Sequence, residues 1–399
     1  MTTTNELPSI PGTRDSRCPF APPAEYTDWR ESDGLRRVTL RNGQTAWAVN
    51  RFEDIRAVLS DPTVSADGTN PNLPKTVPVD ESVPLFFQMK DDPEHARLRK
   101  MLTKHFTVKR VNELRPRIQR LADEHLDQMI SKGHPADLVR DFALPIPSLV
   151  ISLMLGVPYS DHDFFQRNST AVLSADSSAD EQQQATGRLF GYLLDLLNRR
   201  ESEPGDDILS QLLTEHVATG ELTREEAAMN GVALLVAGHE TTAKMITLGT
   251  LVLLRNPDQL ARVRDTDDQA VIAGAVEELL RYITFAEMIT RVATEDITVG
   301  GQVIKAGEGI ALNLLSGNHD PSFFKDPGAV DVDRNARGHV AFGFGVHQCL
   351  GQPLARAELQ IALSTLLRRL PGLRLAVPFE QVTFRDDIGT NVRNLPVAW

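Results

Sequence analysis

The most informative segment of the chain is Phe342-Gly343-Phe344-Gly345-Val346-His347-Gln348-Cys349-Leu350-Gly351. Two glycines come shortly before the cysteine, and a third follows it. Because glycine has no Cβ, it lets a backbone turn tightly and approach a flat ligand closely. The segment therefore predicts a tight loop that presents Cys349 to a bound group.

A helix is expected directly after this loop. Pro353 is tolerated in its first turn, and Pro371-Gly372 would end it. Leucines spaced by four, three and four residues form one helical face: Leu359, Leu363, Leu366 and Leu370. Cys349 would then lie at a helix N-terminus, where free N–H groups and the positive end of the helix dipole favour thiolate over thiol.

A single thiolate held in this way suits an axial ligand of haem iron. Zinc and iron–sulfur sites normally need several ligands, and the second cysteine, Cys18, cannot supply them alone. The alternative interpretation is a free, buried structural cysteine in a glycine-rich turn. A dinucleotide-binding fingerprint fails, because Gln348 stands where its third glycine is needed.

The form Phe-x-x-Gly-x-His-x-Cys-x-Gly resembles the haem-binding signature of the cytochrome P450 family, and every position is met. The resemblance runs from about Phe52 to Trp399 and is to the actinobacterial type of soluble haem-thiolate monooxygenase. It implies a mainly α fold with small β-sheets, the cytochrome P450 fold, in a single domain over 1–399 whose first residues, about 1–20, form a short irregular segment. It also implies haem b, with Cys349 as the iron ligand. The loop residues expected to contact the cofactor are Phe342, Gly343, His347 and Gly351.

Periodicity independently predicts a largely helical chain. The longest helix is expected from Thr223, which opens a capping box with Glu226, to the proline of Asn256-Pro257. Another helix should stop near Gly133, with Pro116 in its first turns or at a kink. Hairpins are predicted around Asn42-Gly43 and Gly300-Gly301. Residues 61–92 read as a long ordered loop, and the stretch after Leu373 as irregular β-structure.

The predicted long helix contains a polar turn, Ala237-Gly238-His239-Glu240-Thr241-Thr242. A carboxylate and hydroxyls in an apolar helix are costly unless they have partners. The alternative interpretation is an ordinary solvent-facing turn. By the resemblance, Thr241 matches the threonine that hydrogen-bonds bound dioxygen, and Glu240 matches the acid that relays protons. These two are the expected catalytic residues.

Charged residues elsewhere gain roles from the same resemblance. Glu278 and Arg281, three apart on one helical face, match the Glu-x-x-Arg motif, with Arg334 as the third member; we expect these charges to stabilise the fold. Haem propionates are carboxylates that need cations. The expected propionate partners are His95, Arg99, Arg291 and His339.

Composition limits the partners. The 399 residues carry 54 acidic and 42 basic side chains, a net charge of −12, which argues against nucleic-acid binding. The N-terminus lacks the pattern of a signal peptide, and the most apolar stretch contains Glu240 and Lys244, so no membrane span is expected. Two distant cysteines favour a reducing compartment, and we expect a cytoplasmic monomer.

The family resemblance implies a bulky hydrophobic substrate, such as a polyketide, a macrolide, a sterol-like compound or a xenobiotic of secondary metabolism. The expected substrate-binding residues are Val83, Phe86, Phe87, Leu234, Ala237 and Ile289. Since no flavin or iron–sulfur motif occurs, the electrons for O2 activation should come from NAD(P)H through a ferredoxin reductase and a ferredoxin. A basic cluster could dock the donor: Arg97, Arg99, Lys100, Lys104, Lys109 and Arg110, with Arg337; the alternative is a solvated basic face.

Two rival functions remain open. A peroxide-driven peroxygenase would typically lack the acid–alcohol pair of Glu240 and Thr241. A haem-binding sensor or carrier without turnover would need neither residue.

Overall fold

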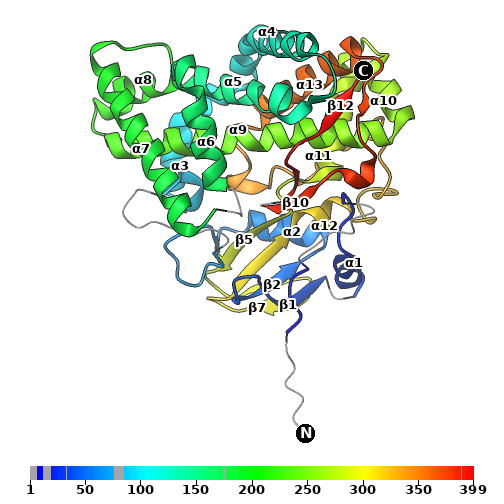
Figure 1. Ribbon diagram of the computed structural model, residues 1–399. Helices are drawn as coiled ribbons and strands as arrows, with labels where there is room; N and C mark the ends of the chain where they lie inside the picture. The colour runs from blue at the N-terminus through cyan, green and yellow to red at the C-terminus, as the bar shows by residue number, and fades with distance from the viewer. Residues whose placement is uncertain (1–6, 12–18, 33, 76–84, 174–176, 388) are drawn as a thin grey trace.

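One long helix, α9 (Arg224–Arg255), crosses the molecule, with α4, α5 and α13 on one side of it and the main sheet on the other in the view of Figure 1. Its first turn carries the predicted capping box: Thr223 Oγ1 accepts from Glu226 N at 3.0 Å, and Glu226 Oε2 accepts from Thr223 N at 2.9 Å. The structure is a computed structural model that describes residues 7–11, 19–32, 34–75, 85–173, 177–387 and 389–399.

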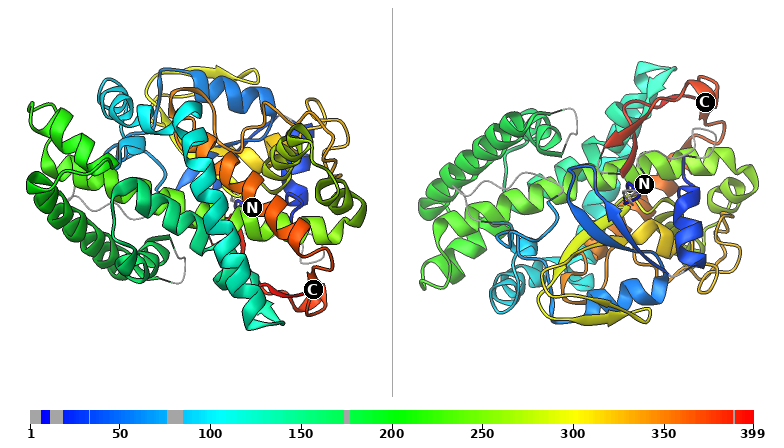
Figure 2. Two further views of the ribbon diagram at one scale, coloured as in Figure 1. Left: turned by 90° about the horizontal axis from the view of Figure 1, so that it is seen from above. Right: turned by 90° about the horizontal axis from the view of Figure 1, so that it is seen from below.

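Most of the described chain is helical. Further helices are α1 (Ala24–Glu31), α2 (Phe52–Ser60), α3 (Glu94–Thr103), α4 (Val108–Lys132), α5 (Pro145–Leu155), α6 (His162–Leu173), α7 (Ala179–Ser202), α8 (Ile208–Leu212), α10 (Pro257–Arg264), α11 (Gln269–Ile283), α12 (Leu314–Asn318) and α13 (Gln352–Arg369). Figure 2 shows α6–α8 (green) on one side of the molecule and the main sheet (blue and yellow) on another.

The main sheet has five strands in the order β1-β2-β8-β5-β3. Its strands are β1 (Leu35–Thr39), β2 (Thr45–Val49), β3 (Val64–Ser65), β5 (Met288–Ala293) and β8 (Gly309–Asn313). The pairing of β2 with β8 is parallel, and the other pairings are antiparallel. This sheet joins segments near residues 40 and 300, so the first hairpin and the segment of Arg291 lie in one layer.

Smaller sheets complete the fold. They are β6 (Ile297–Val299) with β7 (Gln302–Ile304), β10 (Phe384–Asp387) with β11 (Gly389–Val392), and β12 (Pro396–Ala398) between β4 (Ala136–Asp137) and β9 (Arg374–Leu375). Both predicted hairpins are confirmed, as is the β-structure after Leu373. The mainly α class with small β-sheets is therefore confirmed.

Two local predictions need correction. The helix that ends at Gly133 begins at Val108, capped by Thr107, so Pro116 lies in its interior and not in its first turns. Within residues 61–92, strand β3 adds to the main sheet by pairing with β5, and a short 3-10 turn forms at Phe87–Met89. Residues 76–84 of that segment lie outside the described residues.

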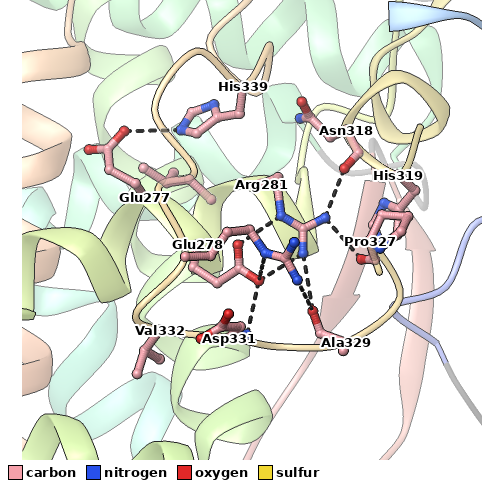
Figure 3. A network of polar contacts seen from close by, with 12 residues as sticks. Glu277, Glu278, Arg281, Asn318, His319, Pro327, Ala329, Asp331, Val332 and His339 are labelled. Atoms are coloured by element: carbon pink, nitrogen blue, oxygen red, sulfur yellow. Dashed lines mark hydrogen bonds and ion pairs between the residues drawn. The ribbon is translucent and has the colours of Figure 1, made fainter. Parts of the chain in front are cut away.

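A buried ion network ties α11 to the segment that leads into the cysteine loop (Figure 3). Glu278 and Arg281 are fully buried, and Arg281 donates to both carboxylate oxygens of Glu278 at 2.7 and 2.8 Å. Arg281 also donates to the backbone oxygens of Asn318 and Pro327. Arg334 Nε lies 3.2 Å from Glu278 Oε1. Two guanidinium groups, one of them 56 residues away in sequence, thus meet at one carboxylate.

We predict that Arg281→Ala destabilises the fold by about 3–5 kcal/mol, because it leaves the Glu278 carboxylate buried without its main partner. Urea unfolding of the purified variant measures this loss, together with the yield of folded protein. The control is Arg262→Ala, which removes an exposed ion pair with Asp333 and should change stability little. Equal stability of the two variants would contradict this structural role.

Candidate functional site

The cysteine loop, Phe342–Gly351, is a closed turn that leads directly into α13. The Cys349 amide donates to Phe342 O at 2.8 Å. Gly343 and Gly345 adopt φ angles of 69° and 72°, which side chains rarely tolerate. A Cβ on Gly345 would also lie 2.2 Å from Leu59 O. The backbone conformation of this loop therefore requires glycine at the positions that the sequence singled out.

The Cys349 side chain is exposed, yet enough protein surrounds its sulfur for burial to raise the pKa of the thiol. A sulfur that borders an open space inside the protein would be both exposed and surrounded by protein atoms. Backbone N–H groups of Gly351 and Gln352 and the charges of Arg99 and Arg356 act in the opposite direction. The predicted donors at the helix N-terminus are thus present, but burial outweighs them. A metal ion bonded to the sulfur would stabilise the thiolate directly.

The polar turn of α9 is also accessible. Ala237 is exposed and Gly238 and Thr241 are half-buried, although the residues that precede them in α9, from Ala227 to Val236, are buried. A Cβ on Gly238 would lie 3.3 Å from Ile151 Cγ1, so α9 packs closely against α5 at this turn. Exposure in the middle of a buried helix indicates that this turn faces open space.

Three of the four polar side chains of the turn have partners, whereas His239 Nε2 is buried without a hydrogen-bond partner among the described residues. Thr241 Oγ1 donates to Ala237 O at 2.7 Å, as expected for a threonine in a helix. Glu240 Oε2 lies 3.2 Å from Lys244 Nζ, with both side chains more than nine-tenths buried. Thr242 makes a hydrogen bond to the Glu358 side chain. These partners explain how a polar turn persists inside an apolar helix.

A cluster of nitrogen donors lies beside the cysteine loop. The rings of His95 and His347 are 4.0 Å apart, and Arg99 Nη2 donates to Gln348 O at 2.6 Å. Burial, with the nearby charges of His95, Arg291 and Arg99, lowers the pKa of His347 to about 3. His95 Nε2 and His347 Nδ1 are buried without a hydrogen-bond partner among the described residues. The structure therefore brings four of the expected propionate and loop residues together.

His339 is the exception among the expected propionate partners. Its Nδ1 accepts from Ala341 N at 3.2 Å, and its Nε2 lies 3.2 Å from Glu277 Oε2 (Figure 3). Although burial raises the pKa of Glu277, contacts with His339 and Arg356 lower it to about 2. The structure thus places His339 against a protein carboxylate, which would compete with a propionate for Nε2.

The expected substrate-binding residues have mixed placements. Ala237 is exposed, Phe86 and Ile289 are half-buried, and Phe87 and Leu234 are buried; Val83 lies outside the described residues. Glu287, in the segment that precedes Ile289, accepts from Thr390 N at 2.9 Å. This bond fastens the β10–β11 hairpin to the segment before β5.

The sequence analysis gave no role in the site to four residues: Glu277, Arg356, Glu358 and Lys244. Arg356 donates to both oxygens of Glu277 at 2.6 and 3.0 Å, and its guanidinium lies 4.7 Å from the Phe342 ring centroid. Glu358 is fully enclosed in α13, and burial raises its pKa to about 8. A charged residue within an apolar helical segment is the sequence feature that could have pointed to Glu358 and Lys244.

The arrangement fits a flat macrocycle with two carboxylates. Such a group would cover the exposed sulfur of Cys349. The unpartnered imidazole nitrogens and Arg291, whose pKa burial lowers to about 10, would gain anionic partners. The fold and this site together define a haem-thiolate protein.

Comparisons with known proteins agree. Residues 176–373 match the family model "Cytochrome P450". Cytochrome P450-SU2 of Streptomyces griseolus is 51% identical, with 98% of this chain and 97% of the relative covered. The vitamin D3 dihydroxylase of the same organism is 45% identical over 99% and 98%. The crystal structure of GfsF superposes with a TM-score of 0.93 at 47% identity, covering 98% of this chain and 100% of that one.

The chain therefore belongs to the cytochrome P450 family. It has the cytochrome P450 fold, binds protoporphyrin IX haem, and is a monooxygenase. Among the described residues, each helix is too short or too polar to cross a bilayer.

We predict that Glu358→Gln flattens the pH dependence of stability. The folded chain keeps a proton on Glu358 up to about pH 8, whereas an unfolded glutamate releases it near 4.5. The free energy of unfolding should therefore fall by up to ~1.4 kcal/mol per pH unit as pH rises through this window. Glutamine removes this loss, so the variant should be the more stable protein at pH 8.

Urea unfolding at pH 5, 6.5 and 8 measures the effect. Glu380→Gln, at an exposed position, is the control and should follow the wild type. Parallel pH curves for the wild type and Glu358→Gln would contradict a buried, protonated Glu358.

Proposed function

We propose that this monooxygenase hydroxylates an unactivated C–H bond of a bulky hydrophobic molecule, with electrons supplied by a ferredoxin. The balanced reaction is RH + O2 + 2e⁻ + 2H⁺ → ROH + H2O. The observation that carries the proposal is that both the sulfur of Cys349 and the turn of α9 that holds Thr241 are accessible. Haem, when bound, supplies the activation of O2, aided by electron donation from a thiolate ligand.

The cofactor would be held from several elements. We assign Cys349 as the iron ligand and Phe342, Gly343 and Gly351 to the loop around it. His95, Arg99, Arg291 and His347 would bind the propionates. This set is supported by their grouping around His347, where charges of all the other three act. Glu278, Arg281 and Arg334 stabilise the fold behind the loop.

Proton supply is assigned to Thr241 and Glu240. The Thr241 hydroxyl donates to Ala237 O and lies on the accessible side of α9, so it can turn its proton toward an oxygen molecule there. Glu240, one residue earlier, would relay a proton from solvent to replace the one that Thr241 gives. A peroxide-driven peroxygenase or a haem sensor would not need this pair, which favours the oxygen-dependent route.

The proposed substrate class rests on the apolar side chains expected to contact the substrate and on the names of similar proteins. Phe86, Phe87 and Leu234 belong to one apolar cluster and Ile289 packs against a second. Together with Ala237 they would give a mainly apolar lining, as expected for a lipophilic ligand. One relative is named a vitamin D3 dihydroxylase, and others include pentalenic acid synthase. We therefore propose a sterol-like, polyketide or xenobiotic compound of similar size. The contribution of Val83 stays a prediction.

The electron donor would dock beside the cysteine loop. The structure reduces the predicted basic cluster, because Arg97, Lys104 and Arg110 each pair with a carboxylate. Arg99 contacts the loop itself, and Lys100 is exposed on the same helix. Val346, at 59% exposure, adds an apolar contact. An acidic ferredoxin, reduced by NAD(P)H through its reductase, fits this basic and apolar surface.

Three further assignments complete the proposal. We place the protein in the cytoplasm, where the reductive electron chain operates, and treat residues 1–399 as one catalytic domain. We also expect a monomer.

We predict that Cys349→Ala abolishes the red-shifted Soret band of the reduced carbon monoxide complex, because that band requires thiolate ligation. The measurement is a difference spectrum of purified protein reconstituted with hemin. Cys18→Ala is the control and should keep the band. Retention of the band in Cys349→Ala would refute the ligand assignment.

We predict that electron transfer from a ferredoxin slows as salt rises, because steering between an acidic donor and Lys100 and Arg99 is screened. Stopped-flow reduction rates at increasing NaCl measure this effect. Lys100→Gln should lower the rate at low salt and weaken its salt dependence. Lys305→Gln, at an exposed turn with a partner in Asp296, is the control. Salt-independent rates would contradict docking at this surface.

A further inference from the structure

Lys244 is a buried cation in the middle of α9. Its side chain is 8% exposed, and its Nζ lies 3.2 Å from Oε2 of Glu240, which is 9% exposed. Ion pairs between residues four apart on a helix are usually solvated and contribute little. Here both charges are removed from solvent, so losing either partner leaves the other strongly disfavoured. The pair therefore constrains where the Glu240 carboxylate can lie.

The position of Lys244 on the helix links it to the accessible turn. Ala237, Glu240, Thr241 and Lys244 are related by steps of three, four and seven residues, so they share one face of α9. Ala237 on this face is exposed, and Thr241 is bonded back to Ala237 O. We call these four residues the 237–244 face. Lys244 is the cation of this face.

A second contact joins this face to a substrate segment. Lys244 Nζ lies 5.0 Å from the ring centroid of Phe285, within the range of a cation–π interaction. Phe285 comes three residues before β5, which carries Ile289 and Arg291. The ammonium group is thus held between a carboxylate on α9 and an aromatic ring beside the proposed substrate residues.

The neighbouring histidine does not compete for Glu240 as a cation. Burial lowers the pKa of His239 to about 4, so its imidazole is neutral near pH 7. Among the described residues, Lys244 is therefore the charged partner of Glu240.

We propose that Lys244 is a positioning residue that holds the Glu240 carboxylate on the 237–244 face. The contact of its ammonium group with the Phe285 ring fixes Lys244 itself. The proposal rests on the proposed function, in which Glu240 replaces the proton given by Thr241. When protons are delivered, RH, O2, two electrons and two protons give ROH and H2O. When delivery fails, the same two electrons reduce O2 with two protons to H2O2, and the substrate is unchanged.

The experiment compares Lys244→Met, Lys244→Arg, Glu240→Gln and the double variant Lys244→Met/Glu240→Gln. Methionine keeps much of the side-chain length but removes the charge, whereas arginine keeps the charge. Carbodiimide labelling of Glu240, read by mass spectrometry on haem-free and haem-loaded protein, reports how firmly the carboxylate is held. We expect faster labelling in Lys244→Met and wild-type labelling in Lys244→Arg. Equal labelling of all Glu240-containing variants would overturn the proposal without any need for turnover.

The second measurement is the fraction of NAD(P)H electrons recovered as H2O2, with vitamin D3 as probe substrate and a ferredoxin–reductase pair as donor. Lys244→Met should raise this fraction toward that of Glu240→Gln, and the double variant should equal Glu240→Gln alone, because both changes act through one carboxylate. Lys305→Met is the matched control, since it breaks an exposed lysine–aspartate pair.

The outcomes distinguish the proton role of Glu240 from the positioning role of Lys244. If Glu240→Gln leaves the peroxide fraction unchanged, Glu240 has no part in proton supply, and the present proposal falls with that assignment. If Glu240→Gln raises the fraction but Lys244→Met does not, or if their effects add, the proton role of Glu240 stands and the role of Lys244 is refuted.

Discussion

The buried ion pair of Glu278 and Arg281 fixes the backbone that leads into the cysteine loop. Such pairs add little net stability, because desolvation offsets attraction, but only one arrangement satisfies all their hydrogen bonds. The adjacent residue, Glu277, points to different partners, Arg356 of α13 and His339 before the loop. One turn of α11 thus holds both flanks of the cysteine loop. The segment before the loop is anchored to Glu278, and α13, which follows the loop, is anchored to Glu277.

The electrostatics of the site are incomplete without an anionic ligand. Burial raises the pKa of the Cys349 thiol and lowers that of His347, so both groups are kept neutral in the protein alone. Arg99 and Arg291 add positive charge nearby. A metal on the sulfur and carboxylates beside the imidazoles would reverse these penalties, which accounts for the unpartnered nitrogens found there.

Local sequence signals predicted the elements but not the contacts between them. Thr223 and Glu226 form a capping box within one turn, and Gly345 is required by its own φ angle and by Leu59 O. These constraints are short-range and could be read directly. The pairing of Glu277 with Arg356 spans 79 residues, and the site of His339 depends on it. Neither periodicity nor the family resemblance carries information on such long-range partners, so the contact of His339 with Glu277 could not be predicted.

Helix α9 separates two carboxyl groups with different chemical roles. Glu358 reaches Thr242 from α13, and burial raises its pKa to about 8, so it is a neutral acid near pH 7. Glu240 belongs to the 237–244 face and is paired with a lysine. The two carboxyl groups thus lie in different environments: Glu358 is a buried neutral acid, and Glu240 is one half of an ion pair. Because Glu240 lies beside Thr241 whereas Glu358 lies on α13, the proton route that we propose runs through Glu240 and Thr241 and does not involve Glu358.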